Sequence, residues 1–515
     1  MSRPEPIPGD VDVTAAPREP VSDPTLGVPL QVVAEGTPRH RLVVVGDSLS
    51  HGFKSLAVSD VEKSYPAMIA RALGWPEFKA PTYEGPGGLP LNLEWLLRDL
   101  EREYGEEISG VIETAMAFGH TRNLFDEHED YWERGPGSRI PRDPWINHNL
   151  AVYGWDLRDV LSRDADVIRR RMVDPSDDPL MQVPENADHL AALRVLDSAR
   201  NARGEALTPL EAAAHLGEDG GIETLIVWVG ANNALPCVVN LNVKWTQDQY
   251  YADPVEKNRY TVWTPKHFKS ELKQVTAAVR QIRARHVLWG TVPHVTIAAL
   301  ARGYGKRAGD SAYFPYYGRP WVDEQTFLRD PDRYPHFTGT EAAAVDRAID
   351  RYNDTICEEV RAAREAGHDW RVVDISGVLD RLAYRRYIEH EAAQPPWWTP
   401  YELPKEFEAV LKFTPDTRFL RSGPGGVSQG GLVSLDGVHP TTVAYSIVAH
   451  EFIQVMTGAG VKFANGIDFA DAAESDTLCF DPLISLENTL DGLRRLDDRF
   501  AIIGRFERAL RFLRS

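Results

Sequence analysis

The sequence contains little cysteine, with only Cys237, Cys357 and Cys479 among 515 residues. These three residues lie far apart, are odd in number and form no Cys-x-x-Cys pair. Their spacing argues against a disulfide framework and against a zinc site built on thiolates. It fits a reducing compartment, so we expect buried, unpaired thiols and, as the default, a cytoplasmic protein.

The sequence also lacks long hydrophobic runs and an excess of basic residues. No stretch of about 18 apolar residues occurs, so we expect no membrane span. The first 39 residues do not combine a basic start with an apolar stretch, so we expect no secretory signal. Lys and Arg total 57 against 76 Asp and Glu, which gives a net charge of −19. That sign repels phosphate backbones at long range, so we expect no nucleic-acid partner.

What remains is an ordinary soluble composition, with 43% hydrophobic and 26% charged residues. The length allows about three domains or one large enzyme domain. We expect a flexible tail over residues 1–38 and one α/β domain over 39–474. Within that domain, 76–146 and 236–340 are predicted to be insertions. Residues 475–515 are predicted to form a C-terminal helical extension.

Short apolar, β-branched runs alternate with amphipathic helical patterns along the domain. The runs predict strands at 41–45, 149–154, 225–229, 287–293 and 370–375. The helical patterns cover 61–73, the residues from 156 on, 186–202, 208–216, 265–284, 341–366 and 442–457, with Thr208 as an N-cap. This alternation predicts an α/β fold with a mainly parallel sheet. The insertions are predicted to hold helices at 89–100 and 108–117, and aromatic-rich segments at 240–263 and 310–338.

Polar residues follow two of the predicted strands and recur near the end of the domain. Gly46-Asp47-Ser48-Leu49-Ser50 follows the first strand, and Gly230-Ala231-Asn232-Asn233 follows the third. Asp436-Gly437-Val438-His439-Pro440 precedes the last helix of the domain. Ligands of open parallel sheets gather at the carboxyl ends of the strands, so we expect these three segments to meet there.

These residue types are those that acyl transfer requires. A serine hydroxyl such as Ser48 needs a general base, which His439 can supply near neutral pH. A carboxylate must orient that imidazole, and Asp436 stands three residues before it. The oxyanion of the intermediate needs fixed donors, for which we predict the backbone N–H groups of Ser48 and Gly154 and the side-chain amide of Asn232.

The three segments in this order resemble the SGNH, or GDSL, hydrolase superfamily. The resemblance implies a three-layer α/β/α sandwich with a mainly parallel sheet. It matches Ser48, Gly154, Asn232 and His439 to the four residues of the family name, and Asp436 to the catalytic aspartate. It also implies a serine ester hydrolase that acts through an acyl-serine intermediate, without metal or organic cofactor. The expected partner is a small-molecule, glycan or lipid ester.

Several alternatives stand beside this hypothesis. Gly85, Gly87 and Gly88 are rivals to Gly154 as the oxyanion glycine. Gly426-Val427-Ser428-Gln429-Gly430 fits a second nucleophile pattern, but it lacks a preceding strand and a following helix, so we expect a loop that can border the site. A cluster with unsuitable metal-ligand spacing is interpreted as a solvated helix face or loop: His120, Asp126, His128 and Asp130.

Two other functions remain open at this stage. The aromatic insertions are compatible with a non-catalytic glycan- or lipid-binding protein on the same fold, and acyl transfer to an acceptor other than water is a third function. The apolar residues from about 482 to 514 recur at helical spacing. We expect that helix to pack on its own domain or to join a homo-oligomer.

Overall fold

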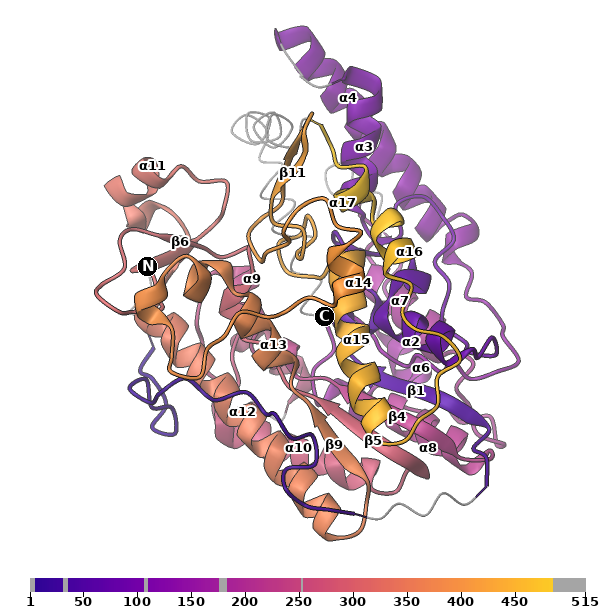
Figure 1. The fold of residues 1–515 in the computed structure, drawn as a ribbon. Coiled ribbons are helices and arrows are strands. Elements are labelled where there is room, and N and C mark those ends of the chain that lie inside the picture. The colour runs from indigo at the N-terminus through magenta and orange to yellow at the C-terminus, as the bar shows by residue number, and fades with distance from the viewer. Residues whose placement is uncertain (1–4, 31–35, 106–109, 176–182, 252, 485–515) are drawn as a thin grey trace.

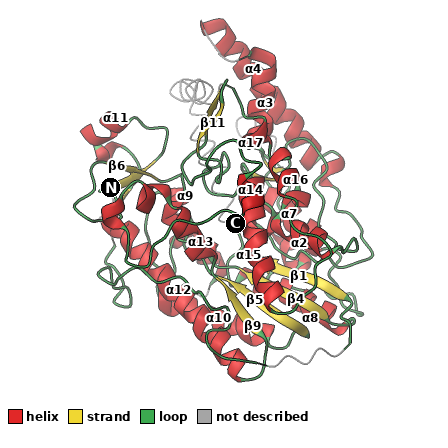
Figure 2. Cartoon of the chain, in the orientation of Figure 1, coloured by secondary structure: helices red, strands yellow, loops and turns green. Residues whose placement is uncertain are grey.

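A four-stranded parallel sheet lies at the centre of the chain in the computed structural model, which describes residues 5–30, 36–105, 110–175, 183–251 and 253–484 (Figures 1 and 2). Its strand order is β1-β4-β5-β9. The strands are β1 (His40–Gly46), β4 (Ile222–Trp228), β5 (Ala284–Gly290) and β9 (Trp370–Val373). Four of the five predicted strands are therefore confirmed, and the chain is a mixed α/β protein.

Helices cover both faces of this sheet, which is why the strands are apolar on both sides. Val43, Val45 and Leu225 face one core, which also contains residues of α7 (Ala187–Leu196), α8 (Pro209–Glu218), α10 (Pro265–Val279) and α12 (Gly339–Glu365). Leu42 and Val44 face a second core with α2 (Tyr65–Leu73) and α15 (Thr442–Gly458). Thr208 caps α8 with a capping box, as its sequence predicts.

The predicted strand at 149–154 is not a strand, although the segment does lie beside the sheet. Residues 148–152 run beside β1 through three backbone hydrogen bonds, which join Val44 and Gly46 to this segment. Only one bridge, between Val44 and Asn149, has ladder geometry. The chain turns away at Gly154, whose φ is +76°, so the segment is too short to continue the sheet.

Several predicted helices begin or end elsewhere. The pattern at 61–73 divides into a 3₁₀ turn (Val61–Lys63) and α2, because Ser64 has extended backbone and Pro66 stands in the first turn of α2. Leu89 and Pro90 pair with β2 (Ala57–Val58) as β3 (Leu89–Pro90), so α3 (Leu93–Tyr104) starts at the Asn92 N-cap. Helix α4 (Gly110–Glu133) is longer than predicted and projects from the body beside α3 (Figure 1).

The remaining elements are short. They include α1 (Ser48–His51), α5 (Asp159–Ser162), α6 (Ala165–Arg171), α9 (Pro236–Asn240), α11 (Glu324–Arg329), α13 (Ile375–Leu382), α14 (Lys405–Glu408), α16 (Phe469–Glu474) and α17 (Thr477–Phe480). Small antiparallel sheets join β6 (Arg302–Tyr304), β7 (Tyr316–Gly318) and β8 (Phe337–Thr338), and separately β10 (Arg421–Gly423) and β11 (Gly426–Gln429).

The segment predicted as a flexible tail makes specific contacts along α12 and β9 (Figure 1). The Arg18 guanidinium lies 3.4 Å from Asp374, and the N–H of Val21 donates to the same carboxylate at 2.6 Å. The N–H of Val372 donates to the carbonyl of Pro24. These contacts are polar and involve residues more than 300 positions away, so the composition of the segment gave no sign of them.

All three cysteines are free thiols; Cys237 is buried as predicted, whereas Cys357 and Cys479 are only partly buried. Within the described ranges, no helix combines the length and hydropathy needed to cross a membrane. The predicted C-terminal helix, at about 482–514, and with it the predicted oligomer contact, falls from residue 485 onward outside the described residues, and residues 482–484 are not helical.

Candidate active site

Ser48 lies directly after β1, at the first position of the short helix α1. Asp47 caps this helix by accepting the N–H of Leu49 at 3.1 Å, and Gly52 ends it with a φ of +91°. This cap fixes the turn from strand to helix, so the Ser48 side chain is held at the carboxyl edge of the sheet. The residue is only 2% exposed.

The structure brings Ser48 and the predicted base together across 391 positions of sequence. Ser48 Oγ lies 2.9 Å from Nε2 of His439, and Nδ1 of His439 lies 3.0 Å from Oδ2 of Asp436. Both distances are within hydrogen-bond range. The three side chains therefore form a connected hydroxyl, imidazole and carboxylate, all of them buried.

Asp436 is held as an ionised acceptor. Its carboxylate accepts the N–H groups of Val438 and His439 at 2.8 Å each and that of Leu56 at 2.9 Å. Burial alone would raise the pKa of Asp436, but the adjacent His439 and these donors lower it below its usual value. The carboxylate therefore stays charged and keeps Nδ1 of the imidazole as the donor.

The donor from Leu56 comes from strained backbone. Ser55 and Leu56 are consecutive non-glycine residues with φ values of 52° and 65°. Their conformation is stabilised by a reciprocal pair of contacts, in which the N–H of Ser55 donates to Ser434 Oγ and Ser55 Oγ accepts from Leu435. Such strain persists only where its surroundings compensate for it, and it gathers at functional sites.

Asp47, next to Ser48, is a further buried carboxyl group at this site. Burial raises its pKa to about 6, although N–H donors and the nearby His439 oppose that shift. The sequence reasoning gave Asp47 no role beyond the motif. The structure makes it a helix cap whose charge changes within the physiological pH range.

Two of the predicted oxyanion donors are unpaired. Among the described residues, neither the backbone N–H of Ser48 nor that of Gly154 has a hydrogen-bond acceptor. Asn232, in the turn after β4, donates one amide hydrogen of Nδ2 to the carbonyl of Trp155 at 2.9 Å. Within the described ranges the second hydrogen of that amide has no acceptor, so all three groups retain a donor.

Gly154 and its rivals have different surroundings. Gly154 precedes Trp155, whose carbonyl is the group that Asn232 contacts. By contrast, Gly85 and Gly87 pack against Tyr131 and His128 of α4, and Gly88 packs against residues 58 and 59. These three glycines therefore belong to the packing of the first insertion.

His51 is a residue that the sequence reasoning missed. Its Nδ1 accepts the N–H of Tyr153 at 3.1 Å, and its Nε2 lies 2.6 Å from the hydroxyl of Tyr83, which in turn donates to the carbonyl of Ala191. Burial lowers the pKa of His51 to about 3, so the ring is neutral. It links the helix that starts at Ser48 to the turn at Gly154. In the sequence, its position one helical turn after Ser48 was the only sign of a role at this site.

A cluster of ion pairs lies just after the turn at Gly154. The ammonium group of Lys257 lies 2.5 Å from Asp159 and 3.4 Å from Asp156, and Arg163 pairs with Asp159 at 2.7 Å. All four groups are at least mostly buried. Lys257 comes from the second predicted insertion, so that insertion helps to fix the backbone after Gly154.

A cavity of about 110 Å³ borders Ser48 and His439. It extends along the carboxyl edge of the sheet past the ends of β4 and β5 to α13, with α15 on another side. Leu432 and Val433, just beyond the hairpin of β10 and β11, line it, whereas Ser428 in that hairpin is exposed and donates to the carbonyl of Arg421. The Gly426–Gly430 pattern is thus mainly strand β11 rather than the predicted loop.

The His120 cluster does not form a metal site. His120 contacts Asp99 at 2.6 Å, and Nε2 of His128 lies 2.8 Å from the carbonyl of Gly88. Over the part of the chain that the structure describes, no group of three or more candidate ligands is close enough to hold a metal ion.

No family model matches this sequence, and no curated protein does either. The chemistry of the site must therefore be argued from its own residues.

Proposed function

We propose that this chain is a serine ester hydrolase. Ser48 is the nucleophile, His439 the general base and Asp436 the group that orients the base. The observation that carries the proposal is the pair of contacts at 2.9 and 3.0 Å, which link Ser48 Oγ to His439 and His439 to Asp436. A nucleophile, a base and an orienting carboxylate in contact are recognised by geometry and role.

In the first half of the reaction, Nε2 of His439 takes the proton of Ser48 as Oγ attacks the ester carbonyl carbon. The carbonyl oxygen becomes an oxyanion, which the N–H groups of Ser48 and Gly154 and the amide of Asn232 stabilise. The imidazolium then protonates the leaving alkoxide as its bond to the carbonyl carbon breaks. An alcohol leaves and the acyl group remains on Ser48.

In the second half, His439 takes a proton from water, whose oxygen attacks the acyl carbonyl. The same three donors stabilise the second oxyanion. The imidazolium returns the proton to Ser48 Oγ as the acyl bond breaks, and a carboxylic acid is released. Asp436 remains ionised throughout, as its lowered pKa requires.

The proposal includes the finer fold assignment, a three-layer α/β/α sandwich of the SGNH, or GDSL, type. Two observations support it. The central parallel sheet has helices on both faces, and the motifs of Ser48, Gly154, Asn232 and His439 follow one another in this order in the sequence. The lack of matching relatives means that this assignment rests on motifs and geometry alone.

Hydrolysis of a panel of p-nitrophenyl acyl esters by the wild type and by Ser48→Ala tests the proposal. We expect turnover by the wild type and a loss of at least about 10³-fold in kcat for Ser48→Ala, since removing a triad member leaves only binding and the oxyanion donors. Ser428→Ala is the matched control, because that serine lies in the β10–β11 hairpin; it should keep full activity. Equal rates for all three proteins would refute the proposal.

The two other functions give different results in the same assay. A non-catalytic ester- or glycan-binding protein would bind the esters without turnover. An acyltransferase would release the alcohol but place the acyl group on an added alcohol or sugar, which product analysis detects.

A further inference from the structure

The cavity beside Ser48 offers a substrate almost no polar groups. Of its lining side chains, only Ser48, His439, His294 and Thr417 carry polar groups besides the indole of Trp228; the others are aliphatic or proline. Because buried polar atoms need partners, the chemistry of a cavity depends on which of its polar atoms are still free.

The polar groups outside the triad are already engaged. Nδ1 of His294 lies 2.9 Å from Asp380 and its Nε2 lies 3.0 Å from Asp350. Thr417 Oγ1 accepts the N–H of Tyr384 and lies 3.4 Å from the carbonyl of Leu382. The indole of Trp228 donates to the carbonyl of Thr291 at 3.0 Å. A sugar hydroxyl or a carboxylate in this cavity would therefore find no free side-chain partner outside the triad.

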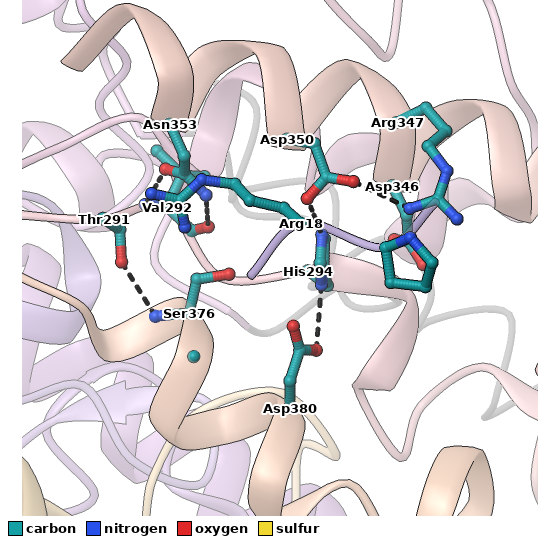
Figure 3. A network of polar contacts seen from close by, with 12 residues as sticks. Arg18, Thr291, Val292, His294, Asp346, Arg347, Asp350, Asn353, Ser376 and Asp380 are labelled. Carbon is teal, nitrogen blue, oxygen red and sulfur yellow. Dashed lines mark hydrogen bonds and ion pairs between the residues drawn. The ribbon is translucent and has the colours of Figure 1, made fainter. Parts of the chain in front are cut away.

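The wall at the end of β5 is fixed by a buried polar network (Figure 3). His294 joins α12 to α13 through the two carboxylates of Asp350 and Asp380, and Arg347 pairs with Asp350 at 2.8 Å. The side chain of Asn353 both accepts from and donates to the backbone of Val292. Thr291 Oγ1 accepts the N–H of Ser376 at 2.9 Å. Because His294 and Asn353 each make two hydrogen bonds, this wall of the cavity cannot easily move to admit a larger ligand.

The volume of the cavity sets the size of what can enter. An aliphatic cavity of about 150 Å³ binds benzene, which has six carbon atoms. By proportion, about 110 Å³ holds an apolar group of about four carbon atoms. The carbonyl carbon of a bound ester would lie outside this space, next to Ser48 Oγ.

We infer that this cavity binds the acyl chain of the substrate, and that the enzyme prefers short linear acyl esters, from butanoyl to hexanoyl, over both acetyl and long-chain esters. This inference rests on the proposed function. The acyl part is assigned to the cavity because it stays attached to Ser48 in the intermediate, whereas the alcohol must leave for solvent.

The test is the dependence of kcat/KM on acyl length, with p-nitrophenyl esters from acetate to decanoate. Each methylene that enters the cavity should raise kcat/KM about fourfold. We expect a rise of roughly 60-fold from acetyl to pentanoyl, then a fall beyond hexanoyl. In a second series, butanoate esters of alcohols of increasing length should differ far less.

Substitutions in the cavity should move the optimum. Val378→Phe on α13 fills space and should shift the preference towards acetyl, and Val378→Ala should shift it towards longer chains. Ala444→Leu on α15 fills the cavity from the other side and replaces Val378→Phe if that variant does not fold. Val455→Phe, on α15 but not lining the cavity, is the matched control and should leave the profile unchanged.

The outcomes separate the inference from the function on which it rests. A profile that peaks between butanoyl and hexanoyl and moves with Val378 supports the inference. Three outcomes overturn the inference and leave the proposed hydrolase function intact, provided that esters are hydrolysed efficiently. They are a preference for acetyl esters, no effect of either cavity substitution, and a rate that depends on the alcohol rather than on the acyl chain. Absence of turnover for every ester, together with no labelling of Ser48 by a p-nitrophenyl phosphonate, overturns both.

Discussion

Nδ1 of His51 accepts the backbone N–H of Tyr153 at 3.1 Å, which ties the helix carrying Ser48 to the turn carrying Gly154. In the proposed mechanism these two segments supply the nucleophile and an oxyanion donor. The relative position of the two therefore depends on a neutral imidazole that does not itself touch the substrate. His51 is a positioning residue.

We expect His51→Leu to lower kcat by up to about 10²-fold, because small displacements of reacting groups carry costs of this size. KM should change little. His51→Asn should recover part of the loss, since its side-chain oxygen can still accept the N–H of Tyr153. Rates should be divided by the concentration of active sites, titrated with a phosphonate.

That normalisation separates positioning from folding. If His51 matters only for stability, the leucine variant will have fewer active sites and a lower Tm but an unchanged kcat per titrated site. This result would remove the positioning role.

Asn232 tests the oxyanion assignment. Asn232→Ala removes the side-chain donor after β4, and we expect kcat to fall by about 10²–10³-fold with KM nearly unchanged. Asn233→Ala is the control, because among the described residues the side chain of that neighbouring amide makes a single long hydrogen bond, accepting the N–H of Leu157 at 3.4 Å. Similar losses in both variants would indicate damage to the turn rather than loss of a donor.

Asp47 should make stability depend on pH. Its folded pKa of about 6 lies above its ordinary value of 3.8, so its contribution to stability is full below about pH 4 and is lost as the pH rises through 6. Asp47→Asn keeps an oxygen for the N–H of Leu49 but cannot ionise. We expect the wild type to lose about 2 kcal/mol relative to this variant between pH 4 and 7.

Denaturant unfolding of both proteins at intervals of half a pH unit measures that difference, in which the other titrating groups cancel. A difference that does not vary over this range would show that Asp47 is not a buried, titrating carboxyl group.

His294 should stabilise the fold as a cation. Burial alone would lower its pKa, but Asp380, Asp346 and Asp350 raise it well above 6.5. The stabilisation is therefore full below its unfolded pKa and is lost as the pH rises through the folded pKa. Removing one partner of a buried ion pair typically costs 3–5 kcal/mol, so we expect about 3 kcal/mol for His294→Gln at pH 6.

The exposed His368→Gln is the control and should cost less than about 0.5 kcal/mol. Equilibrium unfolding at pH 6 and at higher pH values provides the measurement. A cost for His294→Gln below 1 kcal/mol, or one that grows with pH, would contradict the assignment of a buried imidazolium.

The sequence allowed accurate prediction of what is local or repeated. The runs at β1, β4, β5 and β9 are apolar on both sides, which is the mark of a covered parallel strand. Thr208 marks the start of α8 as an N-cap residue. Ser48, Asp436 and His439 could be named because each stands in a motif beside a predicted strand or helix.

Contacts between distant segments that carry no motif were beyond prediction. The network around His294 joins residues 40 to 86 positions apart, and no short motif marks them. The segment before residue 39 was predicted as a flexible tail because it is rich in prolines, acids and small residues, yet Arg18 attaches it to Asp374 after β9 and to Asp354 of α12. The edge segment at 149 has a strand-like sequence, but its length beside β1 is set by the turn at Gly154.

The most direct test of the account is to locate the covalent adduct. The intact protein should be treated with a p-nitrophenyl alkylphosphonate and digested, and the modified peptide identified by mass spectrometry. We predict one phosphonyl group per chain, on Ser48, with labelling slowed at least about 10³-fold in His439→Ala because the serine then lacks its base. Labelling of another serine, or labelling at equal rates in the two proteins, would contradict the claim that His439 activates Ser48.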